Sequence, residues 1–579
     1  MVCINDLKSV WKRLVLSSVL FLPLSATAQG FEMFKGFRIS GTGGISAETY
    51  ASGGIPARRP PFSGQAFLNI NFDLFGLTTG VNTVLSTEES QFRQDINRVQ
   101  LNTQIQWAKI SGGDVTPSFN KYGLDGISVR GGMIEANPQS MIISAVVGQG
   151  QSATASTVED AFRGQSYGQW FYGTKLGYGD ESANYFHLTG FWGRDYDAAI
   201  NDFDFSFDFE EPDPEEPPAE EETLPPVPIE NYIIGPQGAI ELFGGKIRLE
   251  GGMTASIYSR NTEIDRTTHR NAALFGLIAL RPQTQLSYAG DGEIQWVFGP
   301  FRMLTGYERI EPGYESMGLV QIQDDQQVFR LTPQMKFFKN KMTVKLNYNR
   351  RNNNLDLTRT STTVRQQSGI TLSAQPITGV NINTGYDRVG NVGRNQADAS
   401  LESNQLSQSI TFSPSWTKQK NETSHNLMLI TSFQFMDDER PAFSAHTENK
   451  NATLSYALTL PKRKTLSVSA NILKSDTPTM QTSASGAQLN FGMPLYKQKI
   501  QANLIPQFSG NQSVLLIPGQ EERTVSGQNL SISLNLGYKL KSGDVVQFVF
   551  KGLKSNQDNN GTIQSFREFQ GNMTLNRNF

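Results

Sequence analysis

Cysteine is almost absent from this chain of 579 residues, and the single cysteine, Cys3, lies in a segment with the features of a secretory signal peptide. A basic stretch at 8–13 precedes an apolar run over 14–24, and Ala26-Thr27-Ala28 forms a small-residue cleavage site. The apolar run is shorter than the roughly 20 residues that a spanning helix needs, which argues against an N-terminal anchor. Removal of residues 1–28 would leave no cysteine, and this excludes disulfides and thiolate metal sites.

Long hydrophobic runs are also missing after the signal peptide. The hydrophobic fraction is 37% and the mean hydropathy is -0.38, which excludes a bundle of membrane-spanning helices. Apolar and polar residues instead alternate over 98–107, 247–257 and 342–349. Segments of about ten to fourteen residues with this period are typical of tilted strands that cross a bilayer, whereas soluble strands more often have about five or six.

The last fourteen or so residues, 566–579, show the same alternation. One face carries Phe569, Met573, Leu575 and Phe579, and the other face is polar. We expect this segment to pair with 37–50 and close a barrel, because a closed sheet leaves no unpaired backbone in lipid. The sequence therefore predicts an all-β fold, a transmembrane antiparallel β-barrel. The final phenylalanine also resembles the C-terminal signal of bacterial outer-membrane proteins.

The position of the short connections suggests a strand number. Barrels of this class have short turns at one end and long loops at the other. A count of every β-like stretch gives about 26 strands, but it places the turn at 243–246 at the wrong end relative to those near Phe75 and Phe298. Treating 110–139 as a lumenal or periplasmic insert, and 271–280 as part of an external loop, restores the order. We therefore expect about 24 strands (range 22–26) in a single barrel over 29–579.

An acidic, proline-rich segment over 195–231 is predicted to be an extracellular loop. The segment is expected to be a solvated loop, and the alternatives are that it binds calcium or a basic partner. Asp202, Asp204 and Asp208 have a spacing that resembles calcium ligands, but the sixth and twelfth positions of an EF-hand loop would hold Phe207 and Asp213. The EF-hand interpretation fails, loose calcium binding stays open as the weaker alternative, and no other metal or cofactor is expected.

Catalysis finds little support in the sequence. The segment Gly164–Gly168 matches the G-x-S-x-G pattern, but an aromatic strand follows it where the hydrolase elbow requires a helix. The four histidines are widely separated, and none has a metal-ligand spacing. We expect neither an enzyme nor a nucleic-acid-binding protein.

The inward face of the predicted strands mixes both charge signs with amides and hydroxyls, as a water-filled lumen would require. The candidate pore-lining residues are Arg98, Gln104, Arg248, Glu250, Arg330, Lys336 and Lys345. The lumen of a barrel with about 24 strands is too wide for side chains alone to fill. The glycine-rich insert 110–139 is the candidate constriction, through Gly123, Asp125, Gly126, Arg130, Gly131 and Gly132. The alternative is that the insert is a further wall strand with a loop.

Several of these segments carry a family resemblance. The runs 72–77, 113–117, 122–126, 307–316 and 338–341 resemble large outer-membrane β-barrel proteins of the Bacteroidetes lineage, with patchy similarity over about 66–356. The resemblance implies a barrel in the cell outer membrane of a Gram-negative bacterium, and no substrate. TonB-dependent receptors are similar barrels, but they carry a plug domain before the first strand. Alternation begins here by Phe37, so no N-terminal plug is expected.

The sequence thus predicts a channel or translocation conduit with an internal constriction. The alternative is a non-conducting surface scaffold whose external loops bind a partner, and a soluble array of β-sandwiches is the third interpretation. The expected partners are outer-membrane lipids, the barrel-assembly machinery, and a periplasmic or surface protein.

Overall fold

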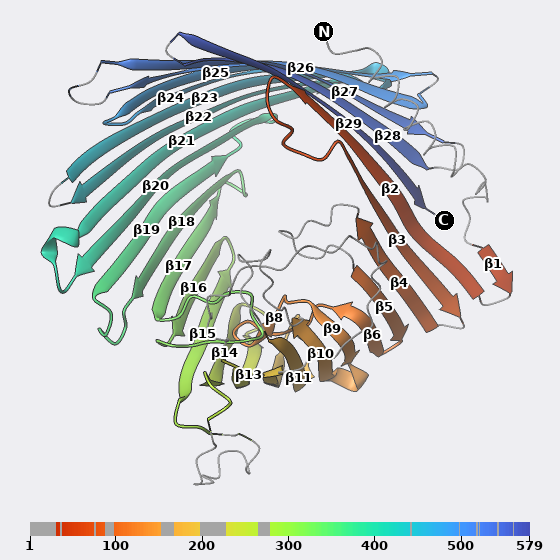
Figure 1. Cartoon of the computed structure of the whole chain (residues 1–579), viewed down its shortest axis with the longest axis vertical. Coiled ribbons are helices and arrows are strands. Elements are labelled where there is room, and N and C mark those ends of the chain that lie inside the picture. The colour runs from red at the N-terminus through yellow and green to blue at the C-terminus, as the bar shows by residue number, and fades with distance from the viewer. Residues whose placement is uncertain are drawn as a thin grey trace, which may run out of the picture.

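A closed ring of antiparallel strands forms the molecule in the computed structural model (Figure 1). The structure describes residues 31–34, 37–74, 77–86, 98–151, 167–196, 227–264, 278, 280–440, 443–496, 498–516, 519, 521–540, 544–559 and 561–578. The main sheet contains 27 strands, of which β1 pairs only with the beginning of β2, so 26 strands form the ring. This number lies at the upper limit of the expected range, and the predicted barrel is confirmed.

The strands have the following bounds: β1 Phe31–Phe34, β2 Phe37–Gly53, β3 Phe62–Leu74, β4 Leu77–Ser86, β5 Arg98–Ile105, β6 Ala108–Val115, β7 Ser118–Asn120, β8 Leu124–Asp125, β9 Val129–Ala136, β10 Met141–Gln151, β11 Gly168–Gly179, β12 Tyr185–Tyr196, β13 Glu230–Leu242, β14 Ile247–Ser259, β15 Thr284–Phe298, β16 Phe301–Ile310, β17 Gln326–Phe337, β18 Met342–Asn353, β19 Ser361–Ala374, β20 Val380–Asn395, β21 Ser403–Lys420, β22 Thr423–Arg440, β23 Phe443–Leu460, β24 Lys464–Asp476, β25 Met480–Leu495, β26 Ile500–Leu515, β27 Arg523–Lys539, β28 Val545–Asn559 and β29 Thr562–Asn578. Among the residues that the structure describes, short 3-10 helices lie at Pro138–Ser140, Ala399–Leu401 and Pro461–Arg463. None of the described residues forms a helix that is long and apolar enough to cross a membrane.

The ring closes between the two ends of the chain, as expected. Strand β29 pairs with β2 from Thr42 opposite Asn578 to Gly53 opposite Arg567, and Figure 1 shows the blue β29 beside the red β2. Phe579 itself lies outside the described residues. Closure gives the backbone of both strands its hydrogen-bond partners, which a sheet in hydrocarbon requires.

The assignment of all of 110–139 to a non-spanning insert is wrong. Strands β6 and β9 belong to the wall, where they pair with each other, with β5 and with β10. The tight turn at Gln106, which has a φ of 31°, ends β5 earlier than the alternation suggests. Two wall strands, β6 and β9, therefore account for most of the segment that was expected to be a non-spanning insert. With 26 strands, the connections from β3 to β4, from β13 to β14 and from β15 to β16 all lie at the same end.

The two ends of the barrel differ in the length of their connections. At the short-turn end, connections such as 338–341 and 421–422 join neighbouring strands directly. The long-connection end carries 116–128 and 311–325, and β12 ends and β13 begins there too. Most of the acidic segment between these two strands, with Asp202, Asp204 and Asp208, lies outside the described residues, as does most of 271–280.

The outer face of the wall is apolar. Leu101, Ile110, Leu176, Leu188 and Leu454 all face outward and are 44–56% exposed, and many other large apolar side chains share this face. A continuous apolar surface of this kind around a closed ring needs hydrocarbon rather than water around it. The wall thus has the construction of a membrane-spanning barrel.

Candidate functional site

The strand register determines which side chains face the lumen. Residues that pair across neighbouring strands share a face, and successive residues alternate. Phe191 on β12 packs against an element inside the ring, and its partners Gly173 and Ile233 share its inward orientation. Following the pairs around the ring places all seven predicted pore-lining residues on the inward face: Arg98, Gln104, Arg248, Glu250, Arg330, Lys336 and Lys345.

Several of these lining residues are paired with neighbours in the wall. Arg248 donates to Glu241 (3.2 Å) and to Glu250 (3.1 Å), and Arg330 pairs with Glu308. The mixed charges on this part of the lumen therefore neutralise one another locally.

An insert over 116–128, with the short strands β7 and β8, folds into the ring from the long-connection end. Its Phe119 and Leu124 are 4% and 1% exposed and pack against the inner wall. The cluster that they complete contains Val115, Val129, Met133, Val146, Phe171, Phe191 and Ile233. Gly123, Asp125 and Gly126 belong to this insert, whereas Arg130, Gly131 and Gly132 belong to the wall strand β9.

A second connection, 311–325, lies against the insert. Ser316 Oγ donates to Gly123 O (2.6 Å), Asp125 N donates to Gly318 O (3.1 Å), and Tyr314 Oη donates to Tyr122 O (2.9 Å). A Cβ atom at Gly318 would lie 2.3 Å from Gly123 O, so only glycine fits this approach. The two segments thus form one lumenal body, which we call the lumenal body below.

Buried amides hold the lumenal body on the wall. Asn120 Nδ2 donates to Thr189 Oγ1 (3.1 Å), and Asn120 Oδ1 accepts from Thr254 Oγ1 (3.2 Å) and from Tyr122 N (2.8 Å). Asn120 is 6% exposed. Buried polar groups with complete partners specify one arrangement, because any displacement leaves them unsatisfied.

A second amide, Asn231 on β13, fixes the connection 311–325. It is 0% exposed; its Nδ2 donates to Ser256 Oγ (2.9 Å) and its Oδ1 accepts from Met317 N (3.2 Å). Ser256 Oγ in turn donates to Glu315 O (2.6 Å). Both segments of the lumenal body therefore have their own polar attachment to the wall.

A charged cluster lies where the insert meets β15 and β16. Lys121 Nζ lies 3.2 Å from Glu308 and 3.9 Å from Asp291, and it donates to Tyr122 Oη (3.1 Å). Burial, together with the carboxylates of Asp291 and Glu308, raises the pKa of Tyr122, and burial raises the pKa of Tyr314. Both phenols are thus neutral at physiological pH, and their rings contact edge to face at 6.5 Å.

A polar cleft of about 290 Å³ lies between the insert and β11 to β13. Lys175, Glu181 and His187 line it together with Asp125 of the insert. Lys175 Nζ lies 2.9 Å from Glu181 Oε1. Within the described part of the chain, no group of three or more His, Cys, Asp or Glu residues is arranged to hold a metal ion.

The inner face of β18 to β28 differs from that of β9 to β16. Its inward positions are mostly amides and hydroxyls, for example Asn383, Ser409, Thr411, Asn451 and Ser469. None of the buried hydrophobic clusters among the described residues lies on this stretch. We call β9 to β16 the covered half and β18 to β28 the open half.

Sequence reasoning missed Phe119, Asn120, Leu124, Tyr314 and Asn231. A signal was present, because the alternation places Phe171, Phe191 and Ile233 on the inward face, where a water-filled lumen would have polar residues. Inward aromatic and aliphatic residues on neighbouring strands indicate that something packs against them.

The chain matches no protein-family model and no curated protein. Among solved structures, it is similar to OccAB2 of Acinetobacter baumannii, with 10% identity and a TM-score of 0.29 over 61% of this chain and 92% of that one. It is also similar to the translocation pore of the P pilus usher PapC, with 10% identity and a TM-score of 0.32 over 93% and 99%. The ferric preacinetobactin receptor BauA of A. baumannii has 9% identity and a TM-score of 0.36 over 93% and 80%. Similarity at this level says nothing about what the chain binds or conducts.

Proposed function

We propose that this protein is a channel or translocation conduit in the outer membrane of a Gram-negative bacterium, narrowed by the lumenal body. The observation that carries the proposal is the contrast inside one ring. The lumenal body packs on the covered half, while polar residues line the open half without a hydrophobic cluster among the described residues. A ring of 26 strands is wider than barrels whose side chains fill the interior, so a polar face of this extent favours a water-filled path.

The apolar exterior supports the membrane location, and the signal peptide supports export. The long connections are then expected to face outside the cell, because short turns lie on the periplasmic side of such barrels. The acidic segment 195–231 would accordingly be extracellular.

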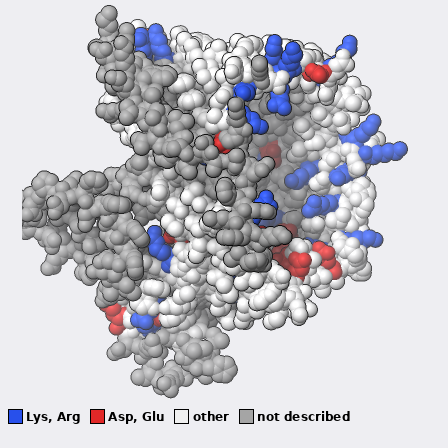
Figure 2. Space-filling model, turned by 90° about the vertical axis from the view of Figure 1, so that its right-hand side faces the viewer, with Lys and Arg blue, Asp and Glu red and all other residues white. Residues whose placement is uncertain are grey.

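Charge is distributed unequally along the barrel axis, which gives the conduit a direction. Figure 2 shows more Lys and Arg than Asp and Glu on the described surface that it presents. At the short-turn end of β17 to β26, the described turns and strand-end residues carry one exposed acid, Glu422, and six exposed bases: Lys339, Lys341, Lys420, Lys462, Arg463 and Lys464. At the long-connection end of β18 to β27, the connections and the strand-end residues carry more exposed acids than bases among the described residues. The acids are Asp356, Asp398, Glu402, Asp476, Glu521 and Glu522, and the bases are Arg359, Arg440 and Arg523.

Local hydrogen bonds keep two of these acids ionised. The hydroxyl and N–H of Ser400 lower the pKa of Asp398, and those of Thr358 lower the pKa of Asp356. We therefore expect a mouth that attracts cations at the long-connection end and a mouth that attracts anions at the short-turn end. Unequal mouths of this kind make the current depend on the sign of the voltage.

Planar-bilayer recording of the purified full chain tests the proposal. We expect stable ohmic steps at low voltage, with unequal currents at +100 and -100 mV that become equal in about 1 M salt, where the Debye length falls to about 3 Å. Replacing Lys462, Arg463 and Lys464 by glutamine should reduce the inequality. A folded barrel that inserts into the bilayer without conducting would overturn the proposal and favour a surface scaffold.

A further inference from the structure

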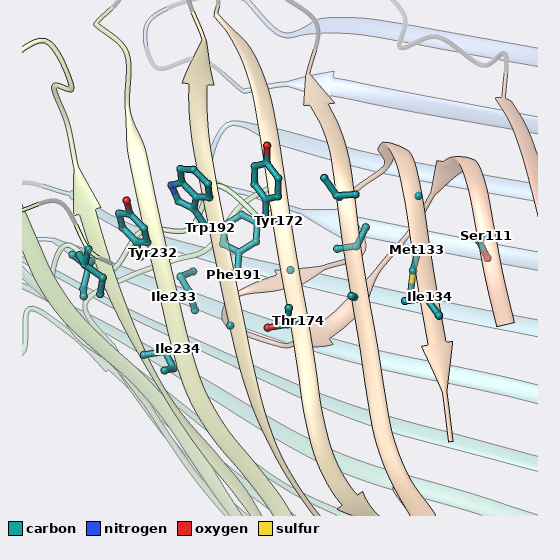
Figure 3. Close-up of a pocket in the computed structure, with 18 of the residues that line it drawn as sticks. Ser111, Met133, Ile134, Tyr172, Thr174, Phe191, Trp192, Tyr232, Ile233 and Ile234 are labelled. Atoms are coloured by element: carbon teal, nitrogen blue, oxygen red, sulfur yellow. The ribbon is translucent and has the colours of Figure 1, made fainter. Parts of the chain in front are cut away.

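The outer face of β9 to β14 carries an apolar depression of about 650 Å³ (Figure 3). Paired neighbours on five strands, β9 to β13, form its floor, in the order Ile134, Ala145, Thr174, Gly190 and Ile234. The three residues in the middle of this row are small, so the wall is hollowed there. This depression lies on the side of the wall opposite to Phe191 and Ile233, which face the lumenal body.

An aromatic shelf borders the depression on the side of the long connections. Tyr172, Trp192 and Tyr232 are paired neighbours on β11, β12 and β13, and Figure 3 shows them side by side. Their rings stack, with centroids 5.0 Å apart for Tyr172 and Trp192 and 5.9 Å apart for Trp192 and Tyr232. Amphipathic rings at this level are typical of the boundary between hydrocarbon and headgroups.

A charged row lies directly beyond the shelf, and its described residues are two arginines, Arg194 and Arg281, and one carboxylate, Glu230. Glu230 accepts from Trp192 Nε1 (3.1 Å), Tyr232 Oη (2.9 Å) and Arg281 Nη1 (2.6 Å). The side chains of Glu230 and Arg281 are 1% and 3% exposed, so this carboxylate is fully engaged. Glu230 therefore forms its ion pair with Arg281 and not with its cross-strand neighbour Arg194.

No described carboxylate lies within ion-pair distance of Arg194. Its described contact is with the ring of Tyr196, whose centroid lies 5.7 Å from Cζ, and its Nε is buried without an acceptor. A guanidinium at the lipid boundary whose N–H groups have no described acceptor can bind an anionic group that approaches from the membrane.

We propose that this face is a binding site for one phosphate-bearing lipid of the leaflet at the long-connection end. An acyl chain would lie in the depression over Ala145, Thr174 and Gly190. The part of the lipid nearest the headgroup would contact the aromatic shelf, and the phosphate oxygens would accept hydrogen bonds from Arg194. The apolar depression, the aromatic shelf and Arg194 follow one another along the strands in the order of acyl chain, interface and headgroup in a lipid. The site requires a bilayer around the barrel and does not depend on whether the lumen conducts.

Native mass spectrometry of the detergent-purified full chain, titrated with phosphatidylglycerol, tests the site. We expect one tightly held lipid per barrel and about tenfold weaker binding in Arg194→Gln, the effect of losing a charge-assisted hydrogen bond. Arg350→Gln is the matched control, because Arg350 faces outward at the same end of β18 and is exposed. Its binding should equal that of the wild type.

A second pair of variants tests the depression itself. Ala145→Phe should fill the hollow and weaken lipid binding, whereas Ala470→Phe, at an exposed outward position on β24, should leave binding unchanged. Both pairs keep the Glu230–Arg281 ion pair intact, and heat-modifiable gel migration checks that each variant is folded.

Two lipid arms complete the test. Diacylglycerol with the same acyl chains, which lacks the phosphate, should bind at least tenfold more weakly than phosphatidylglycerol, and millimolar inorganic phosphate should not displace the lipid. Equal binding of Arg194→Gln and Arg350→Gln, equal binding of the two lipids, or displacement by free phosphate would each overturn the proposal.

Discussion

The covered half and the open half of the ring are built on the same wall, and they differ in what their inward side chains meet. On β10 to β13, inward Val146, Phe171, Phe191 and Ile233 are 2–5% exposed because the lumenal body packs on them. On β20 to β24 the inward positions hold Asn, Ser and Thr that form part of a polar surface. The inward side chains therefore indicate whether a protein segment or water fills that part of the lumen, whereas the outward side chains indicate that the wall faces lipid.

The largest effect is expected from wedging the lumenal body away from the wall. A Cβ atom at Gly173 would lie 2.8–3.0 Å from Leu124, Val146 and Phe119, so Gly173→Leu must displace the insert, at about 3 kcal/mol or more of unfolding free energy. Gly537 is an inward glycine of the open half with room for a side chain, and Gly537→Leu should cost far less. Urea unfolding in detergent measures both, and equal losses would break the comparison between the halves.

A smaller loss is expected from the buried amide. Asn231→Ala removes the acceptor of Met317 N and the donor to Ser256, and leaves buried polar groups unsatisfied, which costs about 1–3 kcal/mol. Asn471→Ala changes an exposed inward amide of the open half, and we expect a change within about 0.5 kcal/mol. If the two variants unfold at the same urea concentration, the amide does not hold the connection 311–325.

The weakest perturbation is alkaline pH. The pKa values of Tyr122 and Tyr314 are raised above the ordinary value of 10.0, so the folded state keeps these protons longer than the unfolded chain does. Their contribution to stability is present below about pH 10 and is lost as the pH rises beyond it. Conductance should therefore be constant from about pH 6 to 9 and increase above about pH 10 as the lumenal body loosens.

Tyrosine-to-phenylalanine variants test which tyrosine causes the increase in conductance at alkaline pH. Tyr122→Phe removes an ionisable group from the interior and should move the onset to higher pH, whereas Tyr386→Phe on the outer face of β20 should not. If Tyr386→Phe shifts the pH at which conductance begins to increase as much as Tyr122→Phe does, the alkaline change does not arise in the covered half.

The sequence predicted the wall better than its contents. Alternation of period two and the pairing of the two chain ends follow from local geometry, and both are confirmed by the register of β2 and β29. The seven charged and amide residues expected inward are inward because parity propagates around the ring. The insert was harder, because Gln106 adopts positive φ with no glycine or proline to mark the turn. Without a signal for this turn, the residues of β6 were assigned to the insert 110–139 and not to the wall.

The lumenal body could not be assembled from the sequence, because its contacts join segments that are far apart in the chain. Asn120 meets Thr254, and Tyr122 meets Tyr314, across more than 130 and 190 residues. No local pattern encodes such pairs. The inward aromatic residues on β11 and β12 indicate only that a partner exists.

The most direct test of the central claim is the size of the largest neutral polymer that enters a single channel, before and after the insert is shortened. In the test variant a short Gly-Ser linker replaces 118–126 and leaves β6 and β9 intact, and in the control the same linker replaces 397–401 in the open half. Conductance and polymer cutoff should both rise in the test variant and stay at the wild-type values in the control. A folded, conducting test variant with an unchanged cutoff would contradict the account, because the lumenal body would then not limit the path.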